Sequence, residues 1–349
     1  MLIINKNTIK NLEKLEKTLP KYINNQVIPK DILDIIDEYI PKLNDNNIHE
    51  AVKYYLSKKK LSKKKNKKNE KQQVIKKYGP INNWNVSQVT NLSKLFKDRI
   101  NFNEDISNWN VSNVTNMSDM FDHAKNFNQS INNWDVSNVK NMSRMFRNAK
   151  QFNQPLNNWN VSNVKHMEQM FHGVTQFNQP LNSWNVSNVT NMEWMFGDTT
   201  KFNQPLNNWN VSNVTPMNSM FYMATFFNQP LNNWDVSNVT NMQCMFAYSK
   251  YNQPLNNWNV SNVELMFGMF SGYSSFNQPL NNWDVSQVTD MKYMFLENEQ
   301  FNQPLNNWDV SNVRYMTDMF KGATSFNQPL NDWNKNIRYH EAFEKESDD

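Results

Sequence analysis

The sequence has a single cysteine, Cys244, among its 349 residues. An intrachain disulfide is therefore excluded, so packing must hold the fold together. The same scarcity excludes a metal site built from several thiolates.

Long apolar runs are also missing. No window approaches the roughly 20 apolar residues that cross a bilayer, and the first residues, Met1 to Lys10, lack the apolar core and cleavage site of a secretory signal. We therefore expect no membrane span, no signal peptide and an intracellular location, in the cytoplasm or, alternatively, in the nucleus or a host cell.

What the chain does have is a repeat. Its tryptophans recur every 25 residues, with one interval of 24, and this spacing is typical of a solenoid whose length counts repeats rather than domains. Numbered from the first of them, units one to eleven contain Trp84, Trp109, Trp134, Trp159, Trp184, Trp209, Trp234, Trp258, Trp283, Trp308 and Trp333.

Each unit follows the pattern Leu-x-x-Trp-Asn/Asp-Val-Ser-x-Val-x-x-Met-x-x-Met-Phe, then a variable loop and Phe-Asn-Gln-Pro. Leu156, Trp159 and Val161 have the spacing of a short strand with inward apolar side chains. A second segment has the i, i+3, i+4, i+7 spacing of a helix of about two turns. In unit two its apolar residues are Met117, Met120, Phe121 and Ala124.

Two details support that helix. Proline is tolerated only in a first helical turn, so Pro216 in unit six makes Thr215 the expected N-cap. Thr190 and Glu193 have the spacing of a capping box one unit earlier. Gly173, Gly272 and Gly322 fit helix ends.

The predicted fold is an α/β repeat solenoid, a leucine-rich-repeat-like array of short parallel strands and short helices with a small helical N-terminal region. About ten repeats occupy residues 80–332. Residues 333–349 are expected to form a degenerate C-terminal cap and an acidic tail.

Residues 1–57 are expected to form a helical N-terminal module, with one helix from Asn47 through Leu56. A solenoid end exposes apolar surface, so a cap over the first repeat is the simplest role. The alternative rests on Ile28-Pro29-Lys30-Asp31-Ile32-Leu33, which resembles the opening of an F-box. That resemblance implies docking to a ubiquitin-ligase adaptor through residues 28–57.

A lysine-rich segment, residues 58–79, follows as an expected solvated linker. Residues 1–79 carry a net charge of +10 and residues 80–349 a net charge of −6. Nuclear import or loose phosphate binding is the alternative role. The lysine run lacks the arginines and aromatic residues of a nucleic-acid reader, so we expect no nucleic-acid partner.

The repeats resemble BspA-like leucine-rich repeats, above all the 25-residue Phe-Asn-Gln-Pro-Leu-x-x-Trp-Asp-Val-Ser-x-Val-x-x-Met form of bacterial surface lipoproteins and large DNA viruses. The resemblance covers about 250 residues and implies a solenoid used for protein binding, often by adhesins. This chain is expected to depart from the surface members, since we expect neither a signal peptide nor a lipid-attachment cysteine.

Groups that would support catalysis are scarce. His123, His166 and His172 occupy different positions in their units, so we expect them to be solvated substitutions. Asp284 and Asp309 are the only acids at the Asn/Asp position after Trp in adjacent units. We expect no enzyme and no cofactor or metal.

Variation between the units points instead to a binding surface. In units five to eight, aromatic or apolar residues replace the polar residues found elsewhere, and exposed apolar surface of this kind marks interaction sites. We call them the aromatic patch: Trp194, Tyr222, Met223, Phe226, Tyr248, Phe267 and Tyr273. Packing among neighbouring loops is the alternative explanation. An earlier zone is basic, with Lys140, Arg144, Arg147, Lys150 and Lys165.

Three functions remain open from the sequence. The first is a non-enzymatic protein–protein interaction scaffold, the second an F-box-like substrate receptor for a ubiquitin ligase, and the third a surface adhesin. All three require a protein partner, whose identity the sequence does not give.

Overall fold

A computed structural model describes residues 41–57 and 70–330, together with residues 333 and 342. The F-box-like segment up to residue 40, the lysine run 58–69 and most of the expected C-terminal cap and acidic tail lie outside these residues.

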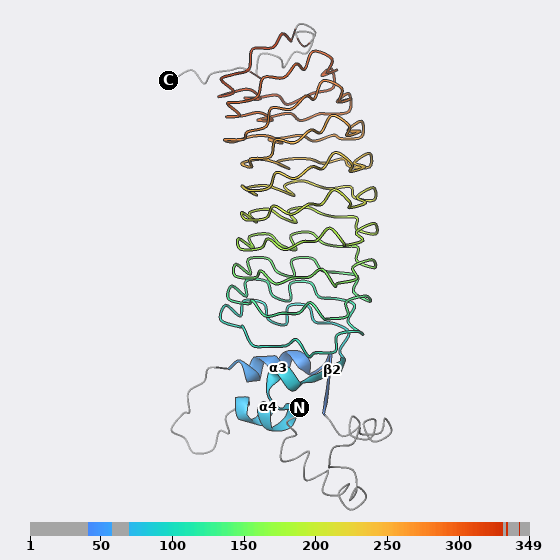
Figure 1. Ribbon diagram of the computed structural model, residues 1–349, viewed down its shortest axis with the longest axis vertical. Coiled ribbons are helices and arrows are strands. Elements are labelled where there is room, and N and C mark those ends of the chain that lie inside the picture. The colour runs from blue at the N-terminus through green and yellow to red at the C-terminus, as the bar shows by residue number, and fades with distance from the viewer. Residues whose placement is uncertain (1–40, 58–69, 331–332, 334–341, 343–349) are drawn as a thin grey trace, which may run out of the picture.

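The repeats form a stack in which each unit makes one turn of the chain and lies on the unit before it (Figure 1). Parallel bridges join equivalent residues of successive units, such as Asn116 with Asn141 and Asn141 with His166. One apolar core runs from Leu43 to Ala342 without interruption. The tandem repeat predicted from the tryptophan spacing is therefore confirmed.

Columns of stacked aromatic rings occupy the core. The Trp184 and Trp209 rings lie 6.5 Å apart and nearly parallel, and a Phe column includes Phe202 and Phe227, with ring centroids 5.9 Å apart. From Trp109 to Trp308, each tryptophan of the column also donates its indole N–H to a backbone carbonyl of the preceding unit, as Trp184 does to Leu156 at 3.0 Å. The repeated apolar positions therefore join the units to one another.

The predicted helix is wrong, although its apolar residues are buried as expected. The segment consists of tight turns with two residues of positive φ in every unit, at Lys94 and Asp98 in the first. In the intervening turns, Leu95 N–H donates to Leu92 O, whereas Lys94 N–H donates to Ser118 O of the next unit. Alternate N–H groups thus link the units and are not available to a helix.

The helix-capping assignments fail for the same reason. Thr190 directs both its N–H and its hydroxyl to Lys165 O in the preceding unit, and Thr215 N–H donates to Thr190 O. Bridges are present at His166–Asn191 and Pro216–Asn241 but not between Asn191 and Pro216. A proline has no N–H to give to the ladder, which explains this interruption.

The predicted strand appears only in the first unit. There β2 (Asn85–Gln88) pairs in parallel with β1 (Lys42–Asn44), a strand that the sequence analysis missed. Across the rest of the described array, the parallel contacts are isolated bridges at the residue before the first methionine of each unit. The expected array of short parallel strands is therefore wrong beyond the first unit, because the turns make the contacts between the described units.

The helical residues before the array cover its first unit (Figure 1). Helix α3 (Ile48–Tyr55) agrees with the predicted helix and buries its apolar face. Helix α4 (Glu70–Tyr78) lies in the expected linker, and its Val74 is buried; it packs against α3. The linker prediction is therefore wrong over α4, because Val74 gives this lysine-rich segment an apolar anchor. The 3-10 helix η1 (Ile81–Asn83) leads into the array.

Contacts to the first unit fix this cap in place. The Tyr55 ring meets the Trp84 ring edge-on at 5.4 Å, and its hydroxyl donates to Glu104 at 2.7 Å. The Asp45 carboxylate accepts the N–H groups of Thr90 and Asn91. At the other end, Trp333 stacks on Trp308, and Ala342 O accepts Phe320 N–H. Both ends of the array are thus partly covered by the chain itself.

Polar side chains form ladders on the outside of the stack. In successive Phe-Asn-Gln-Pro motifs the asparagine side-chain oxygen accepts hydrogen bonds from the next unit, as that of Asn153 does from Asn178 N–H and from the Gln179 amide. The Asn163 amide donates to Ser137 O in the preceding unit. These repeated asparagines therefore have a structural role.

Tyr251 is the one tyrosine in the Phe column, and it lies in the 24-residue unit. Its ring packs between Phe227 and Phe276, but its buried hydroxyl has no hydrogen-bond partner. We expect Tyr251→Phe to raise the free energy of unfolding by about 1–2 kcal/mol, because the unpaired polar group is removed without loss of the ring. Urea denaturation measures the change in the free energy of unfolding. The opposing control is Phe227→Tyr, which adds a buried hydroxyl. A lower midpoint for Tyr251→Phe would contradict the prediction.

Candidate interaction surface

The face formed by the tight turns carries most of the aromatic patch. Trp194, Met223 and Tyr248 each have positive φ, so they occupy the turn positions that keep their side chains off the core. The Trp194 and Tyr222 rings lie 5.1 Å apart, and the Tyr222 and Tyr248 rings 5.7 Å. Trp194, Tyr222 and Tyr248, from units five, six and seven, form a continuous row, which we call the aromatic ladder.

Glycines make room for the ladder. A Cβ on Gly197 would lie 2.7 Å from the Trp194 ring, and a Cβ on Gly272 would clash with the Tyr248 ring. The Trp194 ring therefore packs against the bare backbone of Gly197 in its own unit, and the Tyr248 ring against that of Gly272 in the next unit. Gly197 and Gly272 are the sequence signal that could have shown how the rings lie.

Histidine extends the ladder at its early end. His172 meets the Trp194 ring edge-on at 5.2 Å, and its Nδ1 lies 3.0 Å from Gly197 O. Burial lowers the pKa of His172, an effect that the contact with Gly197 O opposes. The expectation that His172 is a solvated substitution is therefore wrong.

The remaining predicted residues divide into two groups. Phe226 and Tyr273 are strongly exposed, at 66% and 77%, and Met223, in the same unit as Phe226, is also exposed. Tyr273 points outward because Ser274 takes the buried position. Phe267 is half-buried and packs edge-on against Tyr293 at 5.3 Å, so it does not join the aromatic ladder. The sequence analysis also missed an exposed aromatic residue near the C-terminal end, Tyr315.

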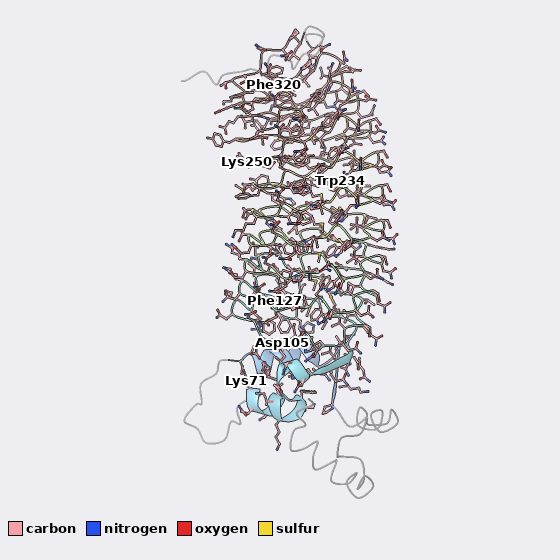
Figure 2. The ribbon with its side chains drawn as sticks, viewed as in Figure 1. Lys71, Asp105, Phe127, Trp234, Lys250 and Phe320 are labelled. Carbon is pink, nitrogen blue, oxygen red and sulfur yellow. The ribbon has the colours of Figure 1, made fainter. Side chains whose placement is uncertain are left out.

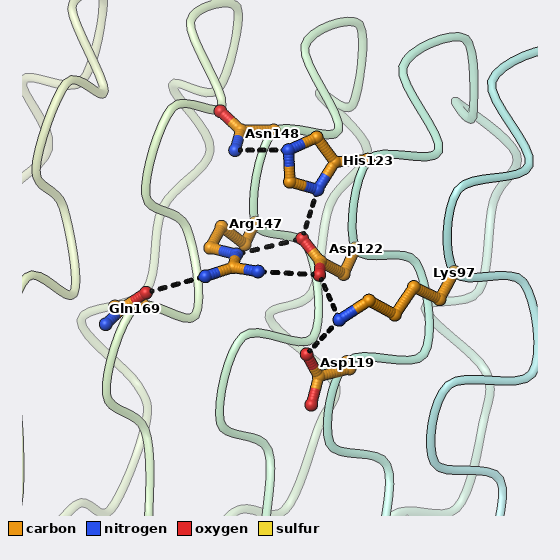
Figure 3. Close-up of polar contacts among 7 residues, drawn as sticks. All are labelled: Lys97, Asp119, Asp122, His123, Arg147, Asn148 and Gln169. Atoms are coloured by element: carbon orange, nitrogen blue, oxygen red, sulfur yellow. Dashed lines mark hydrogen bonds and ion pairs between the residues drawn. The ribbon is translucent and has the colours of Figure 1, made fainter.

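In the early units the same face is ionic (Figure 3). The Asp122 carboxylate is fully buried and lies 2.9 Å from Lys97 Nζ and 2.8 Å from the Arg147 guanidinium. Burial would raise the pKa of Asp122, but hydrogen bonds from Arg147 and Lys97 outweigh it and lower the pKa to about 2. Arg147, one residue of the expected basic zone, is therefore paired with a carboxylate.

His123 and Asp119 complete this cluster. His123 Nδ1 lies 2.7 Å from Asp122 and its Nε2 3.2 Å from the Asn148 amide, so both ring nitrogens have a polar partner. Asp119 accepts a second bond from Lys97 at 3.1 Å. His123 is thus part of a network and not a solvated substitution. Because every charged group here has a protein partner, the cluster stabilises the fold and offers no free nucleophile.

Other reactive groups do not converge. Burial raises the pKa of the Cys244 thiol to about 11, which keeps it protonated and unreactive. Among residues 41–57 and 70–330, no group of three or more His, Cys, Asp or Glu side chains could hold a metal ion. In the same part of the chain, no helix has the length and apolar character needed to cross a membrane.

Comparison with known proteins gives one family. Three tandem segments, residues 63–182, 155–253 and 247–347, match the family described as "Mycoplasma protein of unknown function, DUF285". Comparison with curated proteins and with solved structures gave no match. The three segments run through the repeat array and cover well over half of the sequence, so this chain belongs to the DUF285 family.

Proposed function

We propose that this protein is a non-enzymatic protein-binding scaffold, built on a leucine-rich-repeat solenoid of the BspA-like type. The supporting observation is the exposed aromatic surface of units five to eight. The core explains the repeated Trp, Phe and Met side chains, but it does not require Phe226 or Tyr273 to be aromatic, because both point away from it.

The chemistry of this surface suits a protein partner. Aromatic side chains bury large area at low conformational cost, and contiguous exposed ones surrounded by polar groups mark binding sites. The aromatic ladder is held by its own ring contacts, so little side-chain freedom is lost when a partner covers it. Phe226 and Tyr273 supply further anchors.

The alternatives have weaker support. A ubiquitin-ligase receptor would use residues 28–57 for docking, but α3 buries Ile48, Ala51, Val52 and Tyr55 in the core shared with the array. That burial favours a cap, which we propose as the role of α3 and α4. An adhesin would use the same array, and we found no feature that favours it.

The test is affinity capture with the full chain and with Phe226→Ser/Tyr273→Ser, followed by mass spectrometry. We expect the double variant to lose its partner at an unchanged melting temperature, because both side chains are mainly in solvent. Lys125→Ser/Lys150→Ser changes two loop residues of earlier units and is the matched control. Equal capture by the double variant would contradict the proposal.

A further inference from the structure

The edge of the array beside the aromatic ladder carries lysines. One position of this edge is the residue that comes immediately before the Phe-column residue of each unit in the sequence. In units five, six and seven these residues are Lys201, Phe226 and Lys250, and all three are exposed. Phe226 therefore lies between two lysines, one on the turn before it and one on the turn after. Figure 2 shows Lys250 at the margin of the stack.

These lysines are not neutralised within the fold. Lys201 Nζ donates to the Gln176 side-chain oxygen at 2.6 Å, and no ion pair involves Lys201 or Lys250 in the part of the chain that the structure describes. Lys125 and Lys150 lie in the loops of units two and three, where the uncharged Thr175 and Gln176 of unit four separate them from Lys201. The edge combines unpaired cations with an exposed aromatic ring.

The spacing of the cations selects the ligand. Lys201 and Lys250 are two units apart, roughly 10 Å when neighbouring chains lie about 4.8 Å apart. An extended peptide in the polyproline II conformation has three residues per turn and advances about 3.1 Å per residue, so carboxylates three residues apart lie on one face, separated by roughly 9 Å. The two side chains between those carboxylates would lie to either side of Phe226.

We propose that the Lys201–Phe226–Lys250 edge binds an extended acidic segment of a partner protein, with two carboxylates three residues apart and apolar residues between them. The carboxylates pair with Lys201 and Lys250, and an apolar side chain packs on Phe226. This inference rests on the proposed protein-binding function and adds the chemical class of the partner.

A single-stranded nucleic acid is the competing ligand with negative charges and flat rings. It is disfavoured because a nucleic acid needs cations along its whole phosphate backbone, whereas residues 80–349 carry a net charge of −6 and this edge supplies two lysines, which match a segment with two carboxylates. The aromatic ladder also lacks a stack of parallel faces for bases, since its rings meet at 54° and 73°.

The test measures fluorescence anisotropy of labelled peptides with the full-length protein. The probe is Gly-Ser-Asp-Leu-Phe-Glu-Ser-Gly, and a peptide of the same composition with Asp and Glu adjacent is its control. We expect the probe to bind at least tenfold more tightly than the control. The variant Lys201→Glu/Lys250→Glu should bind the probe at least tenfold more weakly than the parent. It should bind a version of the probe with Lys-Leu-Phe-Lys at its centre more tightly than the parent does. The control variant Lys125→Glu/Lys150→Glu should change the ratio of the affinities for probe and control peptide little.

The outcomes separate this inference from the function on which it rests. Equal binding of probe and control, or an unchanged affinity in Lys201→Glu/Lys250→Glu, overturns the inference. If an uncharged Gly-Ser-Asn-Leu-Phe-Gln-Ser-Gly peptide then still binds and loses affinity in Phe226→Ser/Tyr273→Ser, protein binding stands without the acidic specificity. Tighter binding of oligo-deoxythymidine than of the probe also overturns the inference.

Discussion

Trp184→Ala should lower the free energy of unfolding by about 4 kcal/mol, in the range expected for deletion of a buried tryptophan. The Trp184 ring stacks between Trp159 and Trp209 at 6.3 and 6.5 Å and packs against Phe171 at 6.2 Å. Removing it also leaves Leu156 O without its indole donor. Urea denaturation followed by circular dichroism measures the loss.

The position of Trp184 in unit five adds a second expectation. In a stacked array, each unit is stabilised mainly by its neighbours. A weak interface at unit five should therefore split one unfolding transition into two.

Trp184→Phe keeps an aromatic ring but loses the indole N–H, so we expect a cost of only about 1–2 kcal/mol. Ser183→Ala, a change at an exposed neighbour, should stay within about 0.5 kcal/mol of the parent. A single transition with an unchanged midpoint in Trp184→Ala would contradict this account.

The repeat itself could be predicted because the same residue types recur at a fixed spacing in the sequence. The recurring Trp, Val, Met and Phe positions are buried in the described units, and the end of the predicted helix Asn47–Leu56 agrees with α3 to one residue. What an apolar pattern cannot give is the backbone conformation. Met117, Met120 and Phe121 point inward from a chain of tight turns as readily as from a helix.

The missing information was in the residues between the methionines. Lys94, Asp119, Arg144 and Gln169 all have positive φ, a conformation that L-residues adopt at a cost and that glycine signals most clearly. Glycine occurs at this position only once, at Gly268. The turns are held instead by hydrogen bonds to the next unit, and a single-sequence pattern does not reveal such non-local bonds.

The candidate site was predicted in part. Departure from the repeat correctly indicated that Phe226, Tyr248 and Tyr273 are exposed. It could not show that Phe267 turns toward Tyr293 or that His172 packs on Trp194. Each contact joins residues of neighbouring units, and Gly197, which leaves room for His172, lies in the unit after it. Such contacts become visible only when the units are stacked.

Asp122→Ala should cost about 3 kcal/mol, the low end of the range for breaking a buried ion pair, because the cationic partners reach solvent. The variant leaves Lys97, Arg147 and His123 without the carboxylate that joins units one to three. Asp122→Asn keeps the volume and removes the charge, so a similar loss in that variant would assign the effect to electrostatics. Thermal or urea unfolding at pH 7 measures both.

The same carboxylate makes stability depend on pH. The pKa of Asp122 is about 2 in the folded chain against an ordinary value of 3.8. The unfolded chain therefore binds the proton first, and the stabilisation is complete above about pH 4 and disappears as the pH falls toward 2. The shift corresponds to about 2 kcal/mol. We expect the difference in unfolding free energy between the parent and Asp122→Asn to shrink by about that amount between pH 5 and pH 2. A difference that stays constant over this range would show that Asp122 does not titrate as its ion pairs require.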